Sequence, residues 1–69
     1  MQKNVQLTVR EAQVLRLIAR GCTYSQVGAR LGMSAHTVAT HVKNMYRKLG
    51  VHSAAAAVMR AVELQLLQP

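Results

Sequence analysis

The amino-acid sequence predicts an all-α protein, a compact domain of four helices in which the second and third helices form a helix-turn-helix. Ser and Thr residues that can cap a helix occur at four places, and three glycines follow at intervals of helix length. No segment alternates apolar and polar residues with the period of two that a surface strand requires. A hydrophobic fraction of 51% that includes two Tyr and neither Phe nor Trp also favours helices. At 69 residues the chain is expected to form a single domain, residues 1–69.

The first helix is expected over about residues 9–20. Thr8 and Glu11 have the three-residue spacing of a capping box, in which each side chain accepts a hydrogen bond from the backbone N–H of the other residue. Apolar residues then recur at helical spacing. Gly21 provides the helix stop, because glycine adopts the left-handed conformation at low cost.

A second capping box, formed by Thr23 and Gln26, predicts a short helix over residues 24–31. Gly28 lies inside this helix. Because glycine loses more backbone freedom on folding than alanine, Gly28 is expected to weaken the helix by about 0.5–1 kcal/mol. The connection "GMS", residues 32–34, has the tight, glycine-containing form of the turn in a helix-turn-helix.

The third helix is expected over residues 35–49, between an N-cap at Ser34 and a stop at Gly50. At about 100° per residue it has two opposite stripes, one apolar and one polar. The apolar stripe, expected to anchor the helix in the core, consists of Val38, Val42, Met45 and Leu49. The polar stripe, expected to face outward, consists of His36, Thr40, Lys43 and Arg47. Such a helix is about 22 Å long and fits a DNA major groove about 12 Å wide.

Ser53 is expected to cap a fourth helix over residues 54–67, before Pro69 at the end of the sequence. This helix is richer in alanine and aliphatic residues than one thin core requires. Its aliphatic side chains either complete the core of the domain or form a two-fold interface between two copies of the chain. The candidates for that interface are Ala55, Val58, Met59, Val62 and Leu66.

The charge of the chain indicates a polyanionic partner. Nine Lys and Arg against two Glu give a formal charge of +7, which is typical of proteins that bind nucleic acid or an anionic membrane surface. Solvated helix faces usually mix acids and bases, yet no acid occurs between Ala12 and Val62. The acid-free helix and the tight turn before it together favour DNA. A membrane surface is disfavoured because the basic helices lack aromatic anchors, and no apolar segment is long enough to span a bilayer.

The residues of a catalytic or metal site are not evident in the sequence. Asp is absent, and the two Glu are more than fifty positions apart. His36 and His41 lie about 140° apart around a helix, so they cannot share a metal as an i,i+4 pair does. The single cysteine, Cys22, excludes an internal disulfide and suits a reducing compartment. We therefore expect a cytoplasmic protein that is not an enzyme and that takes no metal, cofactor or small-molecule ligand in this domain.

Three segments in order resemble the helix-turn-helix domain of bacterial transcriptional regulators of the LuxR/NarL type, also called the FixJ or GerE type. They are "LTVREAQVLRLIARG" (7–21), "RLGMS" (30–34) and "TVATHVKNMYRKLGV" (37–51). The resemblance covers about residues 7–67. It implies that the second and third helices bind DNA and that the fourth helix is a dimerisation helix. Domains of this family usually follow a phosphorylation-receiver domain, as in response regulators, or a small-ligand domain.

The resemblance also implies roles for individual residues. In proteins of this family, four positions of the third helix face base edges or nearby phosphates. The residues of this chain at those positions are Ala39, Thr40, Lys43 and Arg47. Those that match residues near backbone phosphates are Thr23, Thr37 and Lys48, and Glu11 is expected to support the scaffold by pairing with a cation or capping its helix. The positive end of the third helix adds Ser34 and His36 as phosphate candidates, and Asn44 lies beside the polar stripe.

The sequence therefore predicts sequence-specific binding of double-stranded DNA by a bacterial transcriptional regulator, with helix 35–49 in the major groove. The expected partners are double-stranded DNA, a second copy of the chain bound through the C-terminal helix on an operator of two half-sites, and RNA polymerase. The alternative is a protein-interaction module that modulates another regulator through helix 54–67. Ala39 and Ser25 keep this alternative open, because the family that the chain resembles commonly has Lys at both positions.

Overall fold

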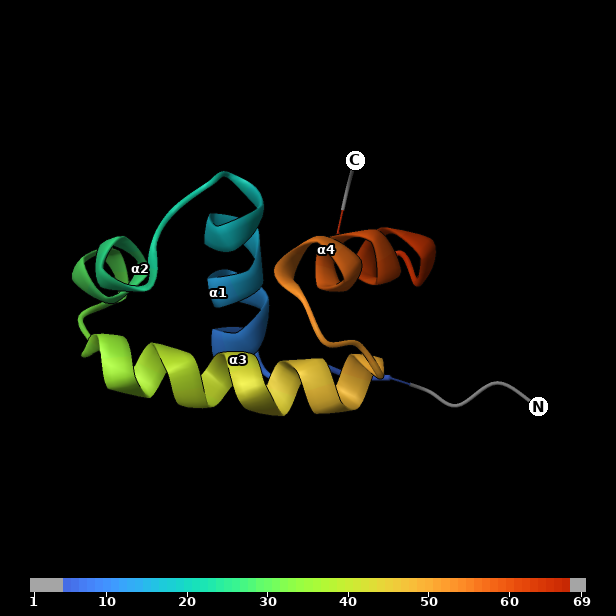
Figure 1. Ribbon diagram of the computed structural model, residues 1–69, viewed down its shortest axis with the longest axis horizontal. Helices are drawn as coiled ribbons and strands as arrows, with labels where there is room; N and C mark the ends of the chain where they lie inside the picture. The colour runs from blue at the N-terminus through green and yellow to red at the C-terminus, as the bar shows by residue number, and fades with distance from the viewer. Residues whose placement is uncertain (1–4, 68–69) are drawn as a thin grey trace.

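The computed structural model describes residues 5–67 and confirms the predicted all-α fold. This part of the chain forms four helices, α1 (Val9–Ala19), α2 (Tyr24–Leu31), α3 (Ala35–Leu49) and α4 (Ala54–Glu63). α3 lies along one side of the molecule, with α2 near its beginning, α1 behind its middle and α4 near its end (Figure 1). None of these four helices has the length and apolarity that crossing a bilayer requires. Residues 1–4 and 68–69 of the predicted domain, including Pro69, lie outside the described residues.

Side chains satisfy free backbone N–H groups at the start of each described helix. The predicted capping box of α1 is complete, because Glu11 N–H donates to Thr8 Oγ1 at 3.1 Å and Thr8 N–H donates to Glu11 Oε1 at 2.9 Å. The box of α2 has the same reciprocal pattern. The four N-caps are Thr8, Thr23, Ser34 and Ser53. Each helix start is therefore specified by its local sequence.

α4 is shorter than predicted, because it ends at Glu63 and not at Leu67. The N–H groups of Leu66 and Leu67 both donate to Ala61 O, at 2.7 and 3.3 Å, and Gln65 has a positive φ of 61°. These bonds close a turn at the point where the sequence predicts a further helical turn. The turn brings the side chains of Leu66 and Leu67 against the core, so burial of apolar surface accounts for the difference. α1 also ends one residue early, at Ala19.

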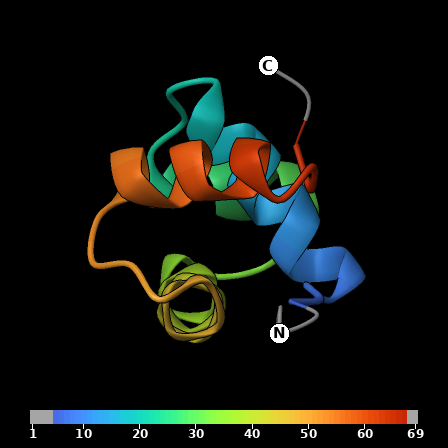
Figure 2. The ribbon, with the colours of Figure 1, turned by 90° about the vertical axis from the view of Figure 1, so that its right-hand side faces the viewer.

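The core consists mainly of small and medium aliphatic side chains, and α3 supplies its largest share. The predicted apolar stripe of α3 is buried along its whole length. Figure 2 looks along α3 and shows the other three helices on one side of it, so its opposite side faces solvent. α4 contributes Ala57 and Ala61, whose small side chains allow its backbone to lie close to the rest of the core. The buried apolar residues are Val14, Leu15, Val27, Val38, Val42, Met45, Leu49, Ala57 and Ala61.

Gly28 has a structural role that differs from the one expected from helix propensity. It is buried in α2, and a Cβ atom built there would lie 2.3 Å from the carbonyl oxygen of Met33. That oxygen belongs to the backbone of the helix-turn-helix connection. The connection is also tied to α2 by a hydrogen bond of 2.9 Å from Met33 N–H to Gly28 O. The expectation that Gly28 weakens this region relative to alanine is therefore wrong for this backbone, because the missing Cβ permits the close approach of the turn.

Gly28→Ala is expected to lower the free energy of unfolding by about 1–3 kcal/mol, since relieving the contact requires the turn to move. This loss opposes and exceeds the gain of about 0.5–1 kcal/mol from helix propensity. Urea unfolding followed by circular dichroism measures the difference. Ser25→Ala, at an exposed position of the same helix, is the control and is expected to change stability by less than about 0.5 kcal/mol. A Gly28→Ala variant more stable than the parent would contradict this account.

Candidate nucleic-acid interface

α3 presents two chemically different faces. Its apolar stripe is buried, whereas Thr40, Lys43 and Arg47 of the polar stripe are exposed, as is His36 in its first turn. Because both stripes follow the helical period, burying one of them turns the other outward. α3 has 15 residues, so at about 1.5 Å per residue the exposed face is about 22 Å long. This face contains cations and short polar groups and no acid.

Lys43 and Arg47 are long cationic side chains of this face, and neither has a partner of opposite charge in the described part of the chain. Within residues 5–67 the ion pair recorded is that of Lys48 with Glu11, and Lys43 and Arg47 take no part in it. The other glutamate, Glu63, lies at the end of α4. The charges of Lys43 and Arg47 therefore remain available to an anion outside the chain.

His52 lies beside this face, although the sequence assigned it no role. A hollow of about 350 Å³ at the C-terminal end of α3 is lined by Lys43, Tyr46, Arg47, Val51 and His52. The exposed imidazole of His52 extends the polar surface beyond the helix. Helical periodicity could not have found it, because Gly50, with a φ of 69°, ends α3 and the following loop has no fixed angular relation to the stripes.

Tyr46 packs at the edge of the same hollow and is half-buried. Burial raises the pKa of Tyr46, and the nearby Tyr24 of α2 raises it further. The phenol therefore stays neutral at physiological pH. It adds no negative charge to the surface that carries Lys43 and Arg47.

The hydroxyl groups at the start of α3 form part of its cap. Ser34 Oγ accepts a hydrogen bond from Thr37 N–H at 3.1 Å and donates to Thr37 Oγ1 at 3.0 Å. Among the described residues the Thr37 hydroxyl proton has no recorded acceptor, so it can be donated to a phosphate. Thr23 is likewise exposed, and its Oγ1 accepts from Gln26 N–H at 3.1 Å. The Thr37 hydroxyl is therefore the remaining donor in the cap at the positive end of α3, whereas Thr23 caps α2.

Thr40 occupies the middle of the exposed face, and its hydroxyl donates to His36 O at 3.3 Å within the same helix. This bond occupies the Thr40 donor, which leaves its methyl group and oxygen lone pairs to an external ligand. Ala39 and Asn44 flank the face and are half-buried. They therefore border the surface and do not lie at its centre.

Lys48 connects the end of α3 to the start of α1. Its Nζ donates to Glu11 Oε1 at 2.8 Å, and the same oxygen accepts the N–H of Thr8. The Glu11 side chain is 4% exposed and that of Lys48 is 39% exposed. Glu11 thus performs both roles expected of it, as a capping residue and as the partner of a cation.

The environment of Glu11 favours its ionised form. Burial raises the pKa of Glu11, but the hydrogen bonds from Lys48 Nζ and from the Thr8 backbone, together with the charge of Lys48, lower it by more. The pKa of this carboxyl therefore lies below its ordinary value. The ammonium group of Lys48 stays accessible to a second anion, since the Lys48 side chain is more exposed than the carboxylate that it contacts.

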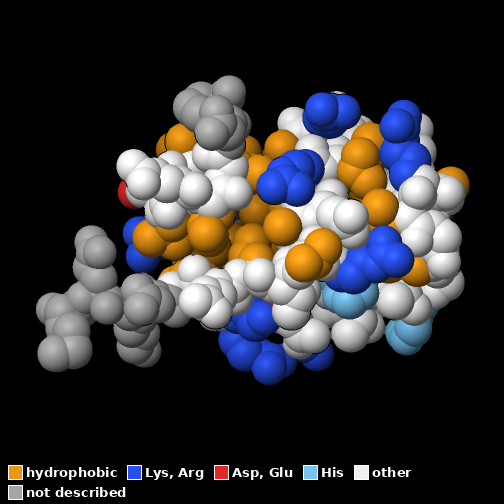
Figure 3. Space-filling model, turned by 180° about the vertical axis from the view of Figure 1, so that it is seen from behind, with side chains coloured by type: hydrophobic (Ala, Val, Ile, Leu, Met, Phe, Trp, Pro, Cys, Tyr) orange, Lys and Arg blue, Asp and Glu red, His pale blue; other side chains and the backbone are white. Residues whose placement is uncertain are grey.

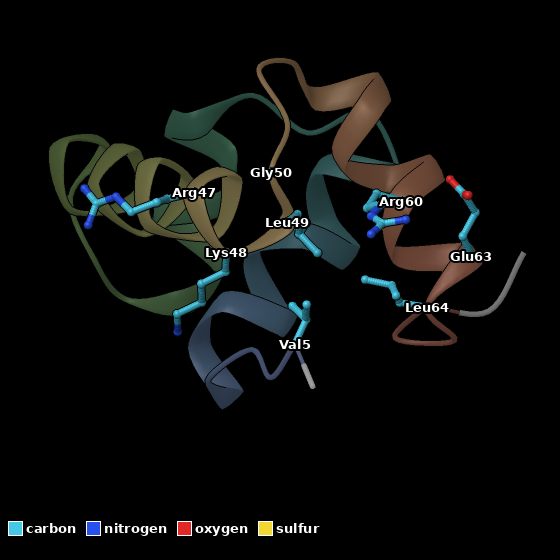
Figure 4. A pocket seen from close by; sticks show the side chains of 8 residues that line it. All are labelled: Val5, Arg47, Lys48, Leu49, Gly50, Arg60, Glu63 and Leu64. Carbon is cyan, nitrogen blue, oxygen red and sulfur yellow. The ribbon is translucent and has the colours of Figure 1, made fainter. Parts of the chain in front are cut away.

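A hollow of about 560 Å³ lies between the end of α3, α4 and the start of the described chain (Figure 4). Val5, Leu49 and Leu64 point toward its centre, whereas Arg47 and Lys48 extend away from it. Arg60 and Glu63 of α4 also line it. Within residues 5–67 no three His, Cys, Asp or Glu side chains are grouped to hold a metal ion.

The five residues predicted for a dimer interface differ in exposure. Met59 is the large apolar residue on the outer side of α4, with 67% of its surface exposed. Ala55 is exposed, and Val58 and Val62 are half-buried. Leu66 lies beyond the end of α4, in the turn that packs against the core. The exposed apolar surface of α4 is therefore centred on Met59.

Comparisons with known proteins agree with this geometry. Residues 5–61 match the family described as bacterial regulatory proteins, luxR family. The chain is 47% identical over 58 residues to the probable transcriptional regulatory protein SgaR of Hyphomicrobium methylovorum, covering 84% of this chain and 28% of that protein. It is 43% identical over 60 residues to the transcriptional activator protein EsaR of Pantoea stewartii subsp. stewartii, covering 87% of this chain and 24% of that protein. The chain thus spans about a quarter of the length of these curated relatives.

Solved structures show the same fold. The transcription factor GerE superposes with a TM-score of 0.86 at 29% identity, over 96% of this chain and 97% of that chain. The response regulator ChrA of a heme-sensing two-component system superposes with a TM-score of 0.87 at 33% identity, over 96% of this chain and 33% of that chain. The four-helix arrangement with a helix-turn-helix is therefore shared with proteins named as transcription factors and response regulators.

Protonation of Glu11 is expected to destabilise the fold. Its pKa is lowered from 4.5, so the stabilisation is complete above the unfolded-state value and is lost as pH falls through the folded-state pKa. The free energy of unfolding should therefore decrease below about pH 4.5, and Glu11→Gln should flatten this decrease. Urea unfolding at a series of pH values measures it. Glu63→Gln, at an exposed position, is the control, and its free energy of unfolding should fall at low pH as much as that of the parent protein. An unchanged acid profile in Glu11→Gln would show that this carboxylate does not stabilise the fold.

Proposed function

This chain belongs to the luxR family of bacterial regulatory proteins and has a helix-turn-helix fold of transcriptional regulators, and we propose that it binds specific sequences of double-stranded DNA through α3. The observation that carries the proposal is the division of α3 into two faces. One face is wholly buried and apolar, and the other is exposed, basic and free of acids. A helix of this length anchored from behind fits the major groove of B-DNA.

Lys43 and Arg47 are proposed to read base edges. Both are long donors on the exposed stripe, and pairing of Arg with guanine O6 and N7 is the commonest specific contact in the major groove. Thr40 lies on the same stripe, and its free methyl group suits contact with the methyl of thymine. Ala39, at the border of the stripe, contributes only apolar contact. Lys43 and Arg47 therefore carry most of the expected sequence discrimination.

A second group of residues is proposed to bind backbone phosphates and fix the register of α3. Hydroxyl and imidazole groups cluster around the positive end of α3, where free N–H groups also favour an anion. Lys48 is proposed to contact a phosphate with the donors that its bond to Glu11 leaves free, since an ammonium group has three. The phosphate candidates are Thr23, Ser34, His36, Thr37, Asn44 and Lys48.

We further propose that two copies of the chain bind an operator of two half-sites, with α4 as the contact between them. Met59 is an exposed large apolar side chain on α4, which suits a self-complementary interface. Half-sites about one helical turn of DNA apart require two copies of α3. A regulator of this kind acts in the cytoplasm, where RNA polymerase is the further proposed partner. If α3 does not bind DNA, the remaining proposal is a protein-interaction module that acts through α4.

Replacing either proposed base-reading residue is expected to weaken DNA binding. Lys43→Ala or Arg47→Ala should cost about 1–3 kcal/mol with relaxed specificity if the residue reads a base. A pure phosphate contact should instead lower affinity for all sequences alike and reduce the salt slope by about one. The measurement is a salt titration with a duplex selected from a random pool and with a random duplex.

Arg20→Ala is the matched control for this titration. Arg20 is exposed at the C-cap of α1, at the end that points away from α3 in Figure 1. Removing this charge should change DNA affinity little, because exposed charges more than about 10 Å away are largely screened at 0.1 M salt. Lys43→Ala and Arg47→Ala variants that bind like Arg20→Ala would refute the proposed role of α3.

Met59→Glu is expected to prevent two copies from assembling on the selected duplex. Burying the new carboxylate in an apolar contact is costly, so the complex should change from two chains per duplex to one. Sedimentation velocity with and without duplex measures this stoichiometry. Ala54→Glu introduces the same charge at an exposed position of α4 about 140° away around the helix and serves as the control. A complex of one chain per duplex in the parent protein would rule out the dimer.

A further inference from the structure

A second group of cations lies on α1 and α2. Arg16 and Arg20 are four residues apart, so they lie on the same side of α1, and Arg30 is in the last turn of α2. All three are exposed. They surround a hollow of about 290 Å³ whose other lining residues are Gln13, Leu17 and Leu31. The hollow thus combines three guanidinium groups with two half-buried leucines.

The charges around this hollow are not neutralised by the described chain. The ion pair recorded within residues 5–67 joins Glu11 to Lys48, and neither residue lines the hollow. Glu63, the other acid, lines a different hollow near the end of α3. Seen from behind, Lys and Arg side chains lie over the upper part of the molecule, with hydrophobic side chains among them, as well as along the lower edge (Figure 3).

Helix-dipole stabilisation explains only part of this arrangement. A cation in the last turn of a helix is favourable by about 0.3–1 kcal/mol, and Arg16 and Arg30 each occupy such a position. That effect accounts for one cation at each helix end. It does not account for three arginines that line one hollow with apolar side chains, where their mutual repulsion is unfavourable.

We propose that this hollow, which we call the arginine hollow and which Arg16, Arg20, Arg30, Leu17 and Leu31 define, binds an acidic segment of another protein. Guanidinium groups bind carboxylates with paired hydrogen bonds. The two leucines provide an apolar contact for an aliphatic or aromatic side chain next to the acids. The ligand class is therefore a peptide segment in which Asp or Glu residues alternate with large apolar residues.

The same geometry disfavours a nucleic acid in the arginine hollow. The ends of α1 and α2 that contribute here are C-terminal and carry partial negative charge, which opposes a bound phosphate and a bound carboxylate alike. A sugar–phosphate backbone, however, offers little apolar surface to Leu17 and Leu31. The anion must therefore be recognised by side chains, and the neighbouring leucines favour a protein.

The arginine hollow and the exposed face of α3 are expected to be occupied at the same time. No residue of α3 lines the hollow, and the C-terminal end of α1 points away from α3 (Figure 1). A chain bound to DNA through α3 would thus present the arginine hollow to a second partner. This inference goes beyond the proposed DNA binding and does not depend on it, because the hollow exists whether or not α3 holds a duplex.

The test uses the full chain and a fluorescein-labelled 12-residue peptide of Asp, Glu and Leu, with fluorescence anisotropy as the readout. Two control peptides replace either the acids by Asn and Gln or the leucines by Ser. Arg16→Gln and Arg30→Gln should each weaken binding of the acidic peptide by roughly three- to tenfold. Arg60→Gln on α4 and Lys43→Gln on α3, neither of which lines the hollow, are the matched controls and should change it by less than about twofold at 0.15 M salt.

Each alternative occupant gives a different result. The proposal requires that both control peptides bind more weakly than the acidic leucine peptide and that saturation of the chain with a 20-base-pair duplex leaves peptide binding in place. Displacement of the peptide by the duplex, together with weaker duplex binding by Arg16→Gln and Arg30→Gln, would assign the hollow to nucleic acid. Equal losses in Arg60→Gln or Lys43→Gln would show general charge attraction, and an absence of binding would overturn the proposal outright. DNA binding by α3 could fail its own test without changing any of these outcomes.

Discussion

Burial of the apolar stripe of α3 is the constraint on which the rest of the structure depends. Four residues of this stripe belong to a core that contains nine buried apolar side chains in the described chain. Helical geometry then determines what the opposite side can present, because residues at the complementary spacing must face solvent. α1, α2 and α4 all pack on the same side of α3, as Figure 2 shows. The fold thus serves to hold one helix from behind and to leave its basic face open.

The chain has only two glutamates, and one of them is used inside the fold. This glutamate, Glu11, caps α1 and holds Lys48. Burial opposes its ionisation, but the hydrogen bonds that it accepts outweigh burial. The ion pair joins the first helix to the end of α3 and removes one cation from full exposure. Among the other cations of the described chain, Lys43 and Arg47 lie on the α3 face and Arg16, Arg20 and Arg30 line the arginine hollow, whereas Arg10 and Arg60 belong to neither.

Local features of this fold could be predicted from the sequence, whereas features that depend on long-range contacts could not. The capping boxes and the buried stripe of α3 follow from spacings of three and four residues. The early end of α4 depends on Leu66 and Leu67 packing against a core built by other helices. The close contact of Gly28 with Met33 and the position of His52 beside α3 likewise require the folded backbone. The residues assigned to DNA stay a prediction, because side-chain exposure shows which groups are available and not which ones a duplex contacts.

The central claim is that the exposed face of α3 enters duplex DNA, and amide chemical-shift mapping during a duplex titration tests it most directly. The account predicts that amide signals from Thr40 to Arg47 shift progressively with added duplex, while those of the C-terminal end of α1 change little. Unchanged signals from Thr40 to Arg47 at saturating duplex, with shifts elsewhere or none, would contradict it.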